Sequence, residues 1–362
     1  MQILSLVPYL PPAIDGVGDY ALNLAMQLRK DFGMKTDFII GNPTNISIPN
    51  IDGFPINQVE IHSAKNLLSL LPKNYPEAST VLLHYVGYGY AKRGCPIWLI
   101  DALEKWRKAN VNSFLVTMFH EVYATGPVWS SSFWLSPLQK NLAVRLSRLS
   151  DRCLTSKQGY AQMLRELSGG KQNQIPALPV FSNIGEPESV PPLTTRPPRL
   201  IIFGSSSNRQ RVYQRSGRAL EKTCQELEIE EILDVGPATG LDLSSINGIP
   251  VEQMGKRTAT EISNMMLNSR VGFFDYHTEY LSKSTIFAAY CAHGLIPVGT
   301  FYSDIQVDGL EAGKNYWLAD RPIGKLNLET GQAIADRAYA WYQNHNLSAQ
   351  AKLFFTYLNF DS

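Results

Sequence analysis

Apolar and polar residues follow two different patterns along the chain, and the patterns alternate. Short apolar runs bounded by turn residues are typical of buried strands, and longer segments with apolar residues at helical spacing are typical of helices. In the first half the predicted strands are residues 3–7, 37–40, 81–85, 114–119 and 152–155, and the predicted helices are 20–30, 97–109, 137–149 and 158–167. This alternation favours βαβ units around a parallel sheet.

The alternation stops at a proline-rich segment, EPESVPPLTTRPP, over residues 186–198, and restarts after it. Five prolines in these thirteen residues cannot continue a helix or a central strand, so the segment is interpreted as a linker. Beyond it the predicted strands are residues 200–203, 232–235, 271–274, 295–298 and 316–318, and the predicted helices are 211–227, 259–268, 328–342 and 348–358.

The sequence therefore predicts two α/β domains, each a doubly wound parallel sheet, with a cleft between them. The expected boundaries are an N-terminal domain at 1–185, the linker at 186–198, a C-terminal domain at 199–335 and closing helices at 336–362. Ligands of open parallel sheets bind at the carboxyl ends of the strands. Candidate functional residues are therefore sought directly after the strands.

Composition narrows the class of protein. The chain has 362 residues, of which 44% are hydrophobic and 18% charged, and its formal net charge of +1 gives no reason to expect a nucleic-acid partner. The four cysteines are scattered without a CxxC pair, which fits a reducing, cytoplasmic location. The sequence indicates no signal peptide and no transmembrane segment, while peripheral membrane contact and the oligomeric state are left open.

A glycine-containing segment follows the first strand. Gly16, Gly18 and Ala21 match the dinucleotide pattern G-x-G-x-x-A, but about eight residues separate the first glycine from the strand. Three interpretations stay open: a dinucleotide site, a loop that lets an anionic ligand approach the N-terminus of a helix at Tyr20, and a plain helix start with Asp19 near the cap.

The strand at 114–119 leads into FHEVYATGP, which places His120 at its carboxyl end. A histidine there faces the expected cleft and is a candidate catalytic group, although a lone histidine is often structural. Glu121 is adjacent and is the alternative acid. Neighbouring residues at the end of a strand point to opposite faces of the sheet, so only one of the two is expected in the site.

The strand at 200–203 leads into GSSSNRQRVY. Gly204, the serines and Asn208 can turn backbone N–H groups inward, and Arg209 and Arg211 lie beyond them. Small residues with a guanidinium are suited to a diphosphate, whereas the alternative is a solvated helix start. Because no acidic pair follows a strand, the sequence does not indicate a divalent-metal site.

The segment LSKSTIFAAYCAHGLIPVG, residues 281–299, combines a loop, a helix and a strand. Ser282 or Ser284 can cap the helix, and Gly294 can end it. Lys283 is unfavourable at a helix N-terminus unless an anion is bound, because ammonium and helix dipole then act on the same charge. We interpret this segment as a phosphate site, and the alternative is a solvent-exposed lysine.

Taken together, these segments resemble the GT-B glycosyltransferases, and the retaining enzymes of family 4 in particular. The glycine loop of that family is matched by Gly16–Gly18, and its histidine after a central strand by His120 in VTMFHE. Asn183 in FSN matches the asparagine that leads into the interdomain linker. Arg209 is the counterpart of the basic residue in the diphosphate loop.

The family signature E-G-F-G-x-x-x-x-E-A-x-A-x-G-x-P-V is matched only in part. YLSKSTIFAAYCAHGLIPV keeps the final A-x-G and the Pro-Val, with one extra residue between them. Counting back from Gly294, the two glutamate positions fall on Leu281 and Ala289. Glu279 can replace the first glutamate if the loop is longer, in which case Phe287 fills the second place.

The resemblance implies a GT-B fold and a metal-independent glycosyltransferase that needs no cofactor and uses a nucleotide-diphosphate sugar, with UDP or GDP as the expected nucleotide. Retention of the anomeric configuration is implied as well. The implied catalytic residues are His120 and Glu279, and the implied donor-binding residues are Gly16, Gly18, Gly204, Arg209, Lys283, Ser284 and Thr285. The missing glutamate leaves a second possibility, an inactive relative that binds an active transferase, and a dinucleotide-dependent oxidoreductase is a third.

Overall fold

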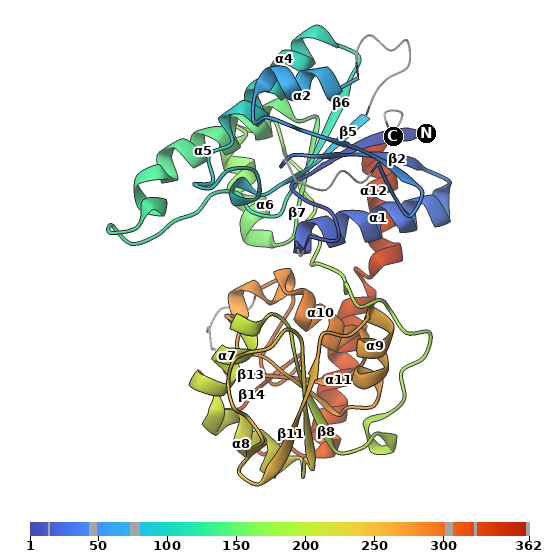
Figure 1. The fold of residues 1–362 in the computed structure, drawn as a ribbon, viewed down its shortest axis with the longest axis vertical. Helices are drawn as coiled ribbons and strands as arrows, with labels where there is room; N and C mark the ends of the chain where they lie inside the picture. Colours follow the sequence, from blue (N-terminus) through green and yellow to red (C-terminus); the bar gives the residue numbers. More distant parts are fainter. Residues whose placement is uncertain (14, 43–48, 73–79, 301–306, 322–323, 360–362) are drawn as a thin grey trace. The chain divides into compact units, whose positions relative to one another are not determined.

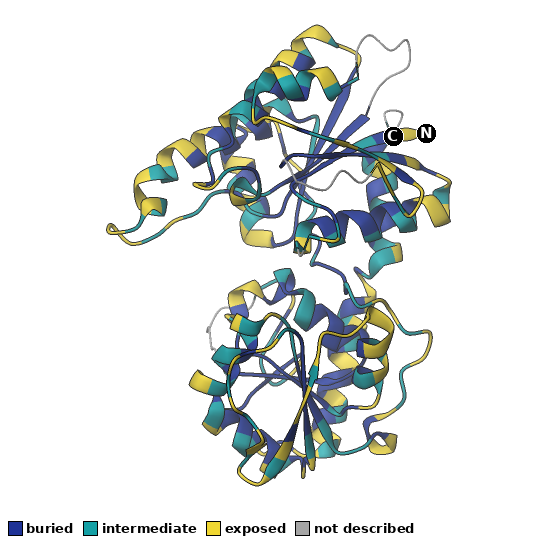
Figure 2. Cartoon of the chain, in the orientation of Figure 1, coloured by how far each residue is buried: buried dark blue, intermediate teal, exposed yellow. Residues whose placement is uncertain are grey.

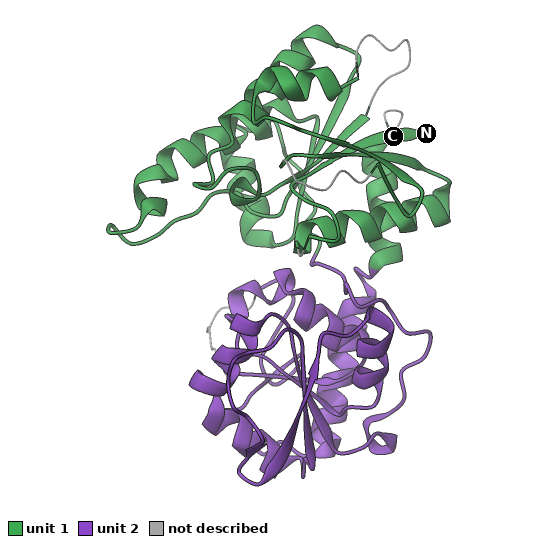
Figure 3. Cartoon of the chain, viewed as in Figure 1, with its two compact units in different colours: residues 1–178, 347–362 green, residues 179–346 purple. Residues whose placement is uncertain are grey.

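The computed structural model describes residues 1–13, 15–42, 49–72, 80–300, 307–321 and 324–359. The chain divides into two compact units, shown in green and purple in Figure 3. Unit 1 contains Met1–Leu178 together with Leu347–Ser362, and unit 2 contains Pro179–Asn346.

Unit 1 is a sheet covered by helices on both faces (Figure 1). Its elements are β1 (Gln2–Val7), α1 (Gly16–Phe32), β2 (Lys35–Ile40), β3 (Asn50–Ile51), β4 (Phe54–Gln58), α2 (Ala64–Leu70), β5 (Thr80–Tyr85), α3 (Gly87–Tyr90), α4 (Ile97–Ala109), β6 (Phe114–Phe119), α5 (Ser131–Leu149), β7 (Arg152–Thr155), α6 (Gln158–Leu167) and α12 (Leu347–Leu358). Every residue of β5 and β6 is buried, which explains why both strands are nearly continuous apolar runs.

Unit 2 has the same layers. Its elements are the 3-10 turn η1 (Leu193–Thr195), β8 (Arg199–Phe203), α7 (Ser206–Arg215), α8 (Gly217–Glu226), β9 (Glu231–Val235), β10 (Ser245–Ile246), β11 (Ile249–Gly255), α9 (Ala259–Leu267), β12 (Val271–Phe273), the 3-10 turn η2 (Thr278–Lys283), α10 (Thr285–Ala292), β13 (Ile296–Gly299), β14 (Trp317–Leu318) and α11 (Leu328–Gln343). Its core contains the buried strands β8, β12 and β13 (Figure 2).

The two sheets have one topology. In the described residues the strand order is β3-β4-β2-β1-β5-β6-β7 in unit 1 and β10-β11-β9-β8-β12-β13-β14 in unit 2. Each sheet is parallel except for one antiparallel pair at its edge, β3 with β4 and β10 with β11. The order reverses between β1 and β5 in unit 1 and between β8 and β12 in unit 2. At such a switch point the loops after the two strands diverge and leave room for a ligand.

The structure confirms the expected fold class, two mostly parallel α/β sheets, and every predicted strand is present. It differs in detail. The helix predicted over 211–227 is two helices, α7 and α8, which meet at Ser216. The Ser216 hydroxyl donates to the buried carboxylate of Asp275 at 3.0 Å, and this contact holds the break in place. The edge hairpins β3–β4 and β10–β11 were not predicted.

The units also begin and end at other residues than the sequence suggests. The proline-rich segment belongs to unit 2, where the buried guanidinium of Arg196 donates to the carbonyls of Pro191, Ser269 and His293. Of the two closing helices, α11 belongs to unit 2 and only α12 to unit 1. There Phe355 stacks on Phe32 of α1, with ring centroids 4.2 Å apart.

Candidate functional site

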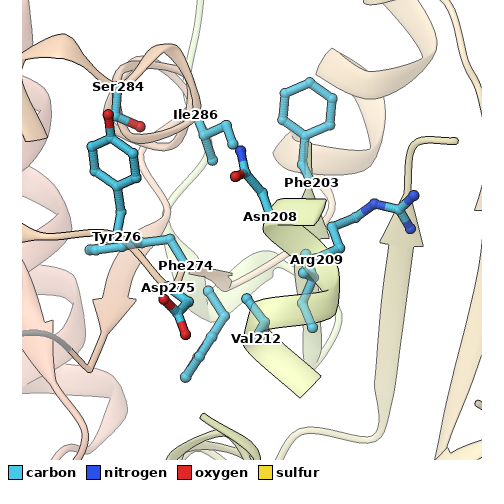
Figure 4. Close-up of a pocket in the computed structure, with 11 residues that line it drawn as sticks. Phe203, Asn208, Arg209, Val212, Phe274, Asp275, Tyr276, Ser284 and Ile286 are labelled. Atoms are coloured by element: carbon cyan, nitrogen blue, oxygen red, sulfur yellow. The ribbon is translucent and has the colours of Figure 1, made fainter. Parts of the chain in front are cut away.

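A pocket in unit 2 lies at the switch point of its sheet (Figure 4). Its walls come from the ends of β8 and β12 and the first turns of α7 and α10. The lining residues are Ile202, Phe203, Asn208, Arg209, Val212, Phe273, Phe274, Asp275, Tyr276, Ser284 and Ile286. An apolar floor with a few convergent polar groups is the usual composition of a small-molecule site.

Two helices begin at this pocket. Ser205 caps α7 by accepting a hydrogen bond from the Asn208 amide at 3.3 Å, and Ser284 caps α10 by accepting from the Phe287 amide at 3.2 Å. The side chains of Asn208 and Ser284 both line the pocket. The first N–H groups of a helix lack partners within the helix and carry a partial positive charge, so both termini favour an anion.

Gly204 allows the loop after β8 to lie close to α10. Its φ is +137°, which side-chain-bearing residues rarely adopt, and an added Cβ atom would lie 2.7 Å from Cδ1 of Ile286. The sequence predicted that this glycine is important, and the structure gives a steric reason. The start of α7 can lie close to the start of α10 only if residue 204 has no side chain.

Arg209 lines the pocket. The sequence suggests that its guanidinium binds a diphosphate, but in the structure the guanidinium is bound by other groups of the protein. The guanidinium forms an ion pair with Asp234 of β9 and donates to the carbonyls of Gly204 and Pro237. Only 2% of its side chain is exposed. In Figure 4 the guanidinium points away from Asn208 and Ser284. Arg209 thus fixes the loops after β8 and β9 and shapes the pocket from behind.

Arg211 and Asp275 form a second polar group at the pocket. Arg211 donates to the Oδ1 atom of Asn208 at 2.5 Å, and its Nε atom lies 3.9 Å from Oδ1 of Asp275. Sequence reasoning did not single out Asp275 or the adjacent Tyr276. They are the second and third residues after β12, and their position beside the switch point was the signal that could have identified them.

The remaining predicted residues of unit 2 flank the pocket without lining it. Thr285 is the first residue of α10, and Lys283 directly precedes its cap, with Nζ 5.9 Å from the centre of the Tyr280 ring. Glu279 lies on η2 with an exposed side chain. Of the two serines considered as cap, Ser284 has that role, while Ser282 donates to Asp308 at 2.5 Å.

The first helix of unit 1 begins earlier than the sequence suggests. It starts at Gly16, and Asp15 is its cap, with Oδ2 accepting from the Gly18 amide at 2.8 Å. A Cβ atom on Gly18 would lie 2.3 Å from the Tyr9 carbonyl oxygen, whereas Gly16 has nothing within 4 Å. The two glycines are thus part of the helix itself. Burial raises the pKa of the Asp15 carboxyl.

His120 directly follows β6 and joins a buried polar cluster in unit 1. Its Nε2 atom lies 3.1 Å from Nδ1 of His84, and its ring packs edge-on against Tyr20 at 5.1 Å. The Tyr20 hydroxyl donates to Oε1 of Gln350 on α12 at 2.6 Å. His84 lies opposite Met118 in the parallel pair of β5 and β6, so His120, two residues further, is on the same face.

The pKa of His84 predicts a pH dependence of stability. Complete burial lowers this pKa from 6.5 to about 3. Between about pH 3 and pH 6.5, His84 therefore binds a proton in the unfolded chain but not in the folded chain. His84 by itself should therefore lower the free energy of unfolding by about 1.4 kcal/mol per pH unit between pH 6.5 and about pH 3, and its contribution is fully retained above pH 6.5. Urea unfolding of the wild type and His84→Asn across this range measures the effect. Equal slopes for both proteins would contradict it.

The described residues offer neither a metal-binding cluster nor a membrane-spanning helix. No three or more of their His, Cys, Asp and Glu side chains are grouped so that they could hold a metal ion. No helix in the described ranges has the length and apolar composition needed to cross a membrane.

No protein-family model matches the sequence, and no curated protein does. Solved structures do resemble the fold over nearly the full length. A trehalose-phosphate synthase from Burkholderia xenovorans, in complex with glucose-6-phosphate, is 11% identical with a TM-score of 0.62, covering 99% of this chain and 100% of that one. Anabaena HepE, in complex with UDP-glucose, is 12% identical with a TM-score of 0.58 and the same coverage.

A third similar structure is an alpha-glucosyltransferase in complex with UDP and a DNA 13-mer, 11% identical with a TM-score of 0.56 and covering 99% of this chain and 98% of that one. These likenesses establish that the chain has the GT-B fold, as the sequence predicted.

Proposed function

We propose that the chain is a glycosyltransferase that moves a sugar from a nucleotide-diphosphate sugar, most simply a UDP-sugar, to a hydroxyl acceptor. The observation that carries the proposal is the pair of helix N-termini, those of α7 and α10, at one pocket of the switch point. The UDP and UDP-glucose in similar structures support a uridine nucleotide.

The diphosphate is assigned to the start of α10. The amides that follow Ser284 and the ammonium of Lys283 would stabilise the negative charge that develops on the leaving nucleoside diphosphate. Loss of one such donor typically costs about 3 kcal/mol of transition-state stabilisation. Gly204 leaves space for the diphosphate to approach the start of α10. Arg209 acts by fixing the loops after β8 and β9 and does not contact the diphosphate.

In unit 1 we assign His120 to the donor sugar or to the acceptor hydroxyl. Its contact with the neutral His84 fixes the ring, which is what a group that exchanges a proton requires. Glu279 remains the candidate for the first carboxylate of the family motif. Gly16 and Gly18 remain the candidates for letting the donor approach the N-terminus of α1. Retention of configuration and independence of metal are part of the proposal through the family resemblance.

Calorimetric titration with UDP, GDP and ADP tests the nucleotide, and thermal shift gives a rapid screen, since a ligand at about 100 times its dissociation constant adds about 2.7 kcal/mol. Release of nucleoside diphosphate from the sugar conjugate of the bound nucleotide then tests the activity. NMR of the product reports the anomeric configuration. Absence of binding by all three diphosphates contradicts the proposal.

Replacement of Lys283 by alanine should weaken UDP binding about tenfold to a hundredfold, because a charge-assisted contact with phosphate contributes about 1.5–3 kcal/mol. Uridine binding should be nearly unchanged, since uridine has no phosphate for the ammonium to meet. The protein should be as stable as the wild type or slightly more so. Equal losses for UDP and uridine would show instead that Lys283 shapes the pocket.

Replacement of His120 by alanine should lower turnover about a hundredfold, the smaller effect expected on losing a general acid or base. His120→Gln is the matched control, because it can keep a hydrogen bond to His84 without exchanging a proton at neutral pH. It should recover stability and not turnover. Turnover per folded molecule equal to that of the wild type in His120→Ala would make this histidine a purely structural residue.

An inactive nucleotide-binding partner of an active transferase is the second candidate. The observation that favours it is in α10. The second glutamate position of the motif falls there on Ala289 or Phe287, and both side chains are fully buried. The pocket is lined at this helix by the apolar side chain of Ile286 and not by a carboxylate. Tight UDP binding without release of UDP from any UDP-sugar, in the presence of sugar, lipid or nucleic-acid acceptors, would favour this candidate.

A further inference from the structure

Large apolar side chains are exposed together at one place in unit 1. They are Val128, Trp129, Phe133, Trp134 and Leu138, here named the aromatic tip, and they lie on the β6–α5 connection and the first turns of α5. The exposed fraction is 85% for Trp129 and 72% for Trp134. This part of α5 is largely in the exposed colour in Figure 2. Scattered exposed apolar residues are ordinary, whereas a cluster marks an interaction surface.

The aromatic tip is held by buried contacts at its base. Gln139 is 2% exposed, and its Oε1 atom accepts from the Ala124 amide at 2.9 Å. Its Nε2 atom donates to the carbonyl of Arg93 at 2.9 Å, in the connection between α3 and α4. One side chain therefore ties the incoming loop, the helix and a neighbouring connection together. The tip is presented from a fixed base, and its rings are exposed in that arrangement.

The distribution of charge around the tip is one-sided. Residues 122–139 contain no charged side chain, and no Asp or Glu occurs between Glu121 and Asp151. Three exposed cations lie near this base: Lys140 follows Gln139 in sequence, Arg93 accepts its hydrogen bond through the backbone carbonyl, and Lys92 directly precedes Arg93. An uncharged aromatic surface with cations at its base is complementary to an apolar layer covered by anionic groups.

We propose that the aromatic tip docks on an anionic lipid surface. Tryptophan favours the boundary between headgroups and acyl chains, because its ring is apolar and its N–H can still be hydrated. Cations attract anionic headgroups over short range, and two such signals together are what stable peripheral binding requires. A two-fold contact between copies is disfavoured, because it would bring the cations of both copies together without an acidic residue in the segment to meet them.

The aromatic tip belongs to unit 1 and the pocket to unit 2, and the proposal does not depend on the nucleotide. Flotation of the whole chain with phosphatidylcholine vesicles, with and without phosphatidylglycerol, is the test. Binding should be at least about tenfold tighter with phosphatidylglycerol and weaken with salt. Trp129→Ser/Trp134→Ser should lower it at least about tenfold, and Lys92→Ala/Arg93→Ala/Lys140→Ala should remove the preference for phosphatidylglycerol.

Two control variants make the result specific. Ile61→Ser/Val111→Ser removes apolar side chains that are 68% and 82% exposed elsewhere in unit 1, and it should bind vesicles like the wild type. Trp129→Phe/Trp134→Phe should keep most of the binding but lose the blue shift of tryptophan fluorescence on vesicle addition. Circular dichroism and melting confirm that each variant is folded.

Three results would overturn the proposal. The first is no binding to vesicles of either composition, and the second is equal binding by the wild type and the Trp129→Ser/Trp134→Ser variant. The third is a dimer of the wild type that forms with rising concentration in sedimentation, loses vesicle binding when it forms, and is absent in Trp129→Ser/Trp134→Ser. That result would make the tip an interface between copies.

Discussion

Substitution of Ser284 by aspartate should weaken UDP binding about a thousandfold without destabilising the protein. Aspartate caps helices as well as serine does, and a negative charge at a helix N-terminus is favourable. The cap of α10 should therefore be kept, since aspartate can accept from the Phe287 amide as Ser284 does. The same carboxylate would occupy the position proposed for the diphosphate, and like charges in close contact cost several kcal/mol.

In this variant UDP affinity should fall while stability is unchanged. This difference distinguishes a role of Ser284 in binding from a role in the structure. Calorimetric titration of UDP measures affinity, and urea unfolding measures stability. Ser63→Asp is the matched control, because Ser63 caps α2 in unit 1 in the same way, accepting from the Asn66 amide at 3.2 Å. It makes the same chemical change at another helix start and should leave UDP binding unaltered.

An unchanged affinity for UDP in Ser284→Asp would place the diphosphate elsewhere and remove the main support for the proposed donor site. Loss of both affinity and stability would mean that aspartate does not fit under the first turn of α10. Ser284→Asn then decides between the two, because asparagine also caps helices but adds no charge. It should bind UDP much more tightly than the aspartate variant.

Substitution of Asp234 by leucine should lower the free energy of unfolding of unit 2 by about 3–5 kcal/mol, the usual cost of removing one partner of a buried ion pair. Asp234 and Arg209 are 1% and 2% exposed, so the guanidinium would be left buried without a counter-ion. Hydrogen exchange or denaturant unfolding followed by the tryptophans of unit 2 measures the loss.

Two further variants establish the cause of this loss. Arg209→Met/Asp234→Leu removes both charges and should recover part of the stability, although the carbonyls of Gly204 and Pro237 then lose a donor. Glu311→Leu breaks an exposed pair with Lys314 in the same unit and should change stability by no more than about 1 kcal/mol. A loss in Asp234→Leu no greater than in Glu311→Leu would contradict the argument.

The same variants test the role of Arg209. If it positions the loops and does not contact the diphosphate, the double variant, once folded, should retain UDP affinity to within about tenfold, less than the loss of a direct charged contact. A hundredfold loss in a folded double variant would restore the direct contact that the sequence suggested.

The sequence predicted the fold from features that are local. The strands β5 and β6 could be identified because helices cover both faces of the sheet, so nearly every residue must be apolar. The hairpins β3–β4 and β10–β11 escaped detection because they lie at the sheet edges. There the strands are partly exposed and two of them have only two residues, so they lack a buried pattern.

The sequence also identified the loops of the site, because polar and glycine residues directly follow buried strands. Gly204 and His120 were selected because each directly follows a strand, and Ser284 because it can cap a helix; their roles in a site stay predictions. It could not give the topological repeat of the two units, since the same strand order is built from unlike sequences. Nor could it give the break at Ser216, which depends on a carboxylate 59 residues away.

What only the tertiary structure decided is which groups are partners. Arg209 meets Asp234 because β9 lies beside β8, and His120 meets His84 because β5 and β6 pair in register. Local pattern determines where strands and helices begin, since backbone propensity and burial act over a few residues. Whether a charged side chain is available to a ligand or neutralised inside the protein depends on residues brought together from distant parts of the chain.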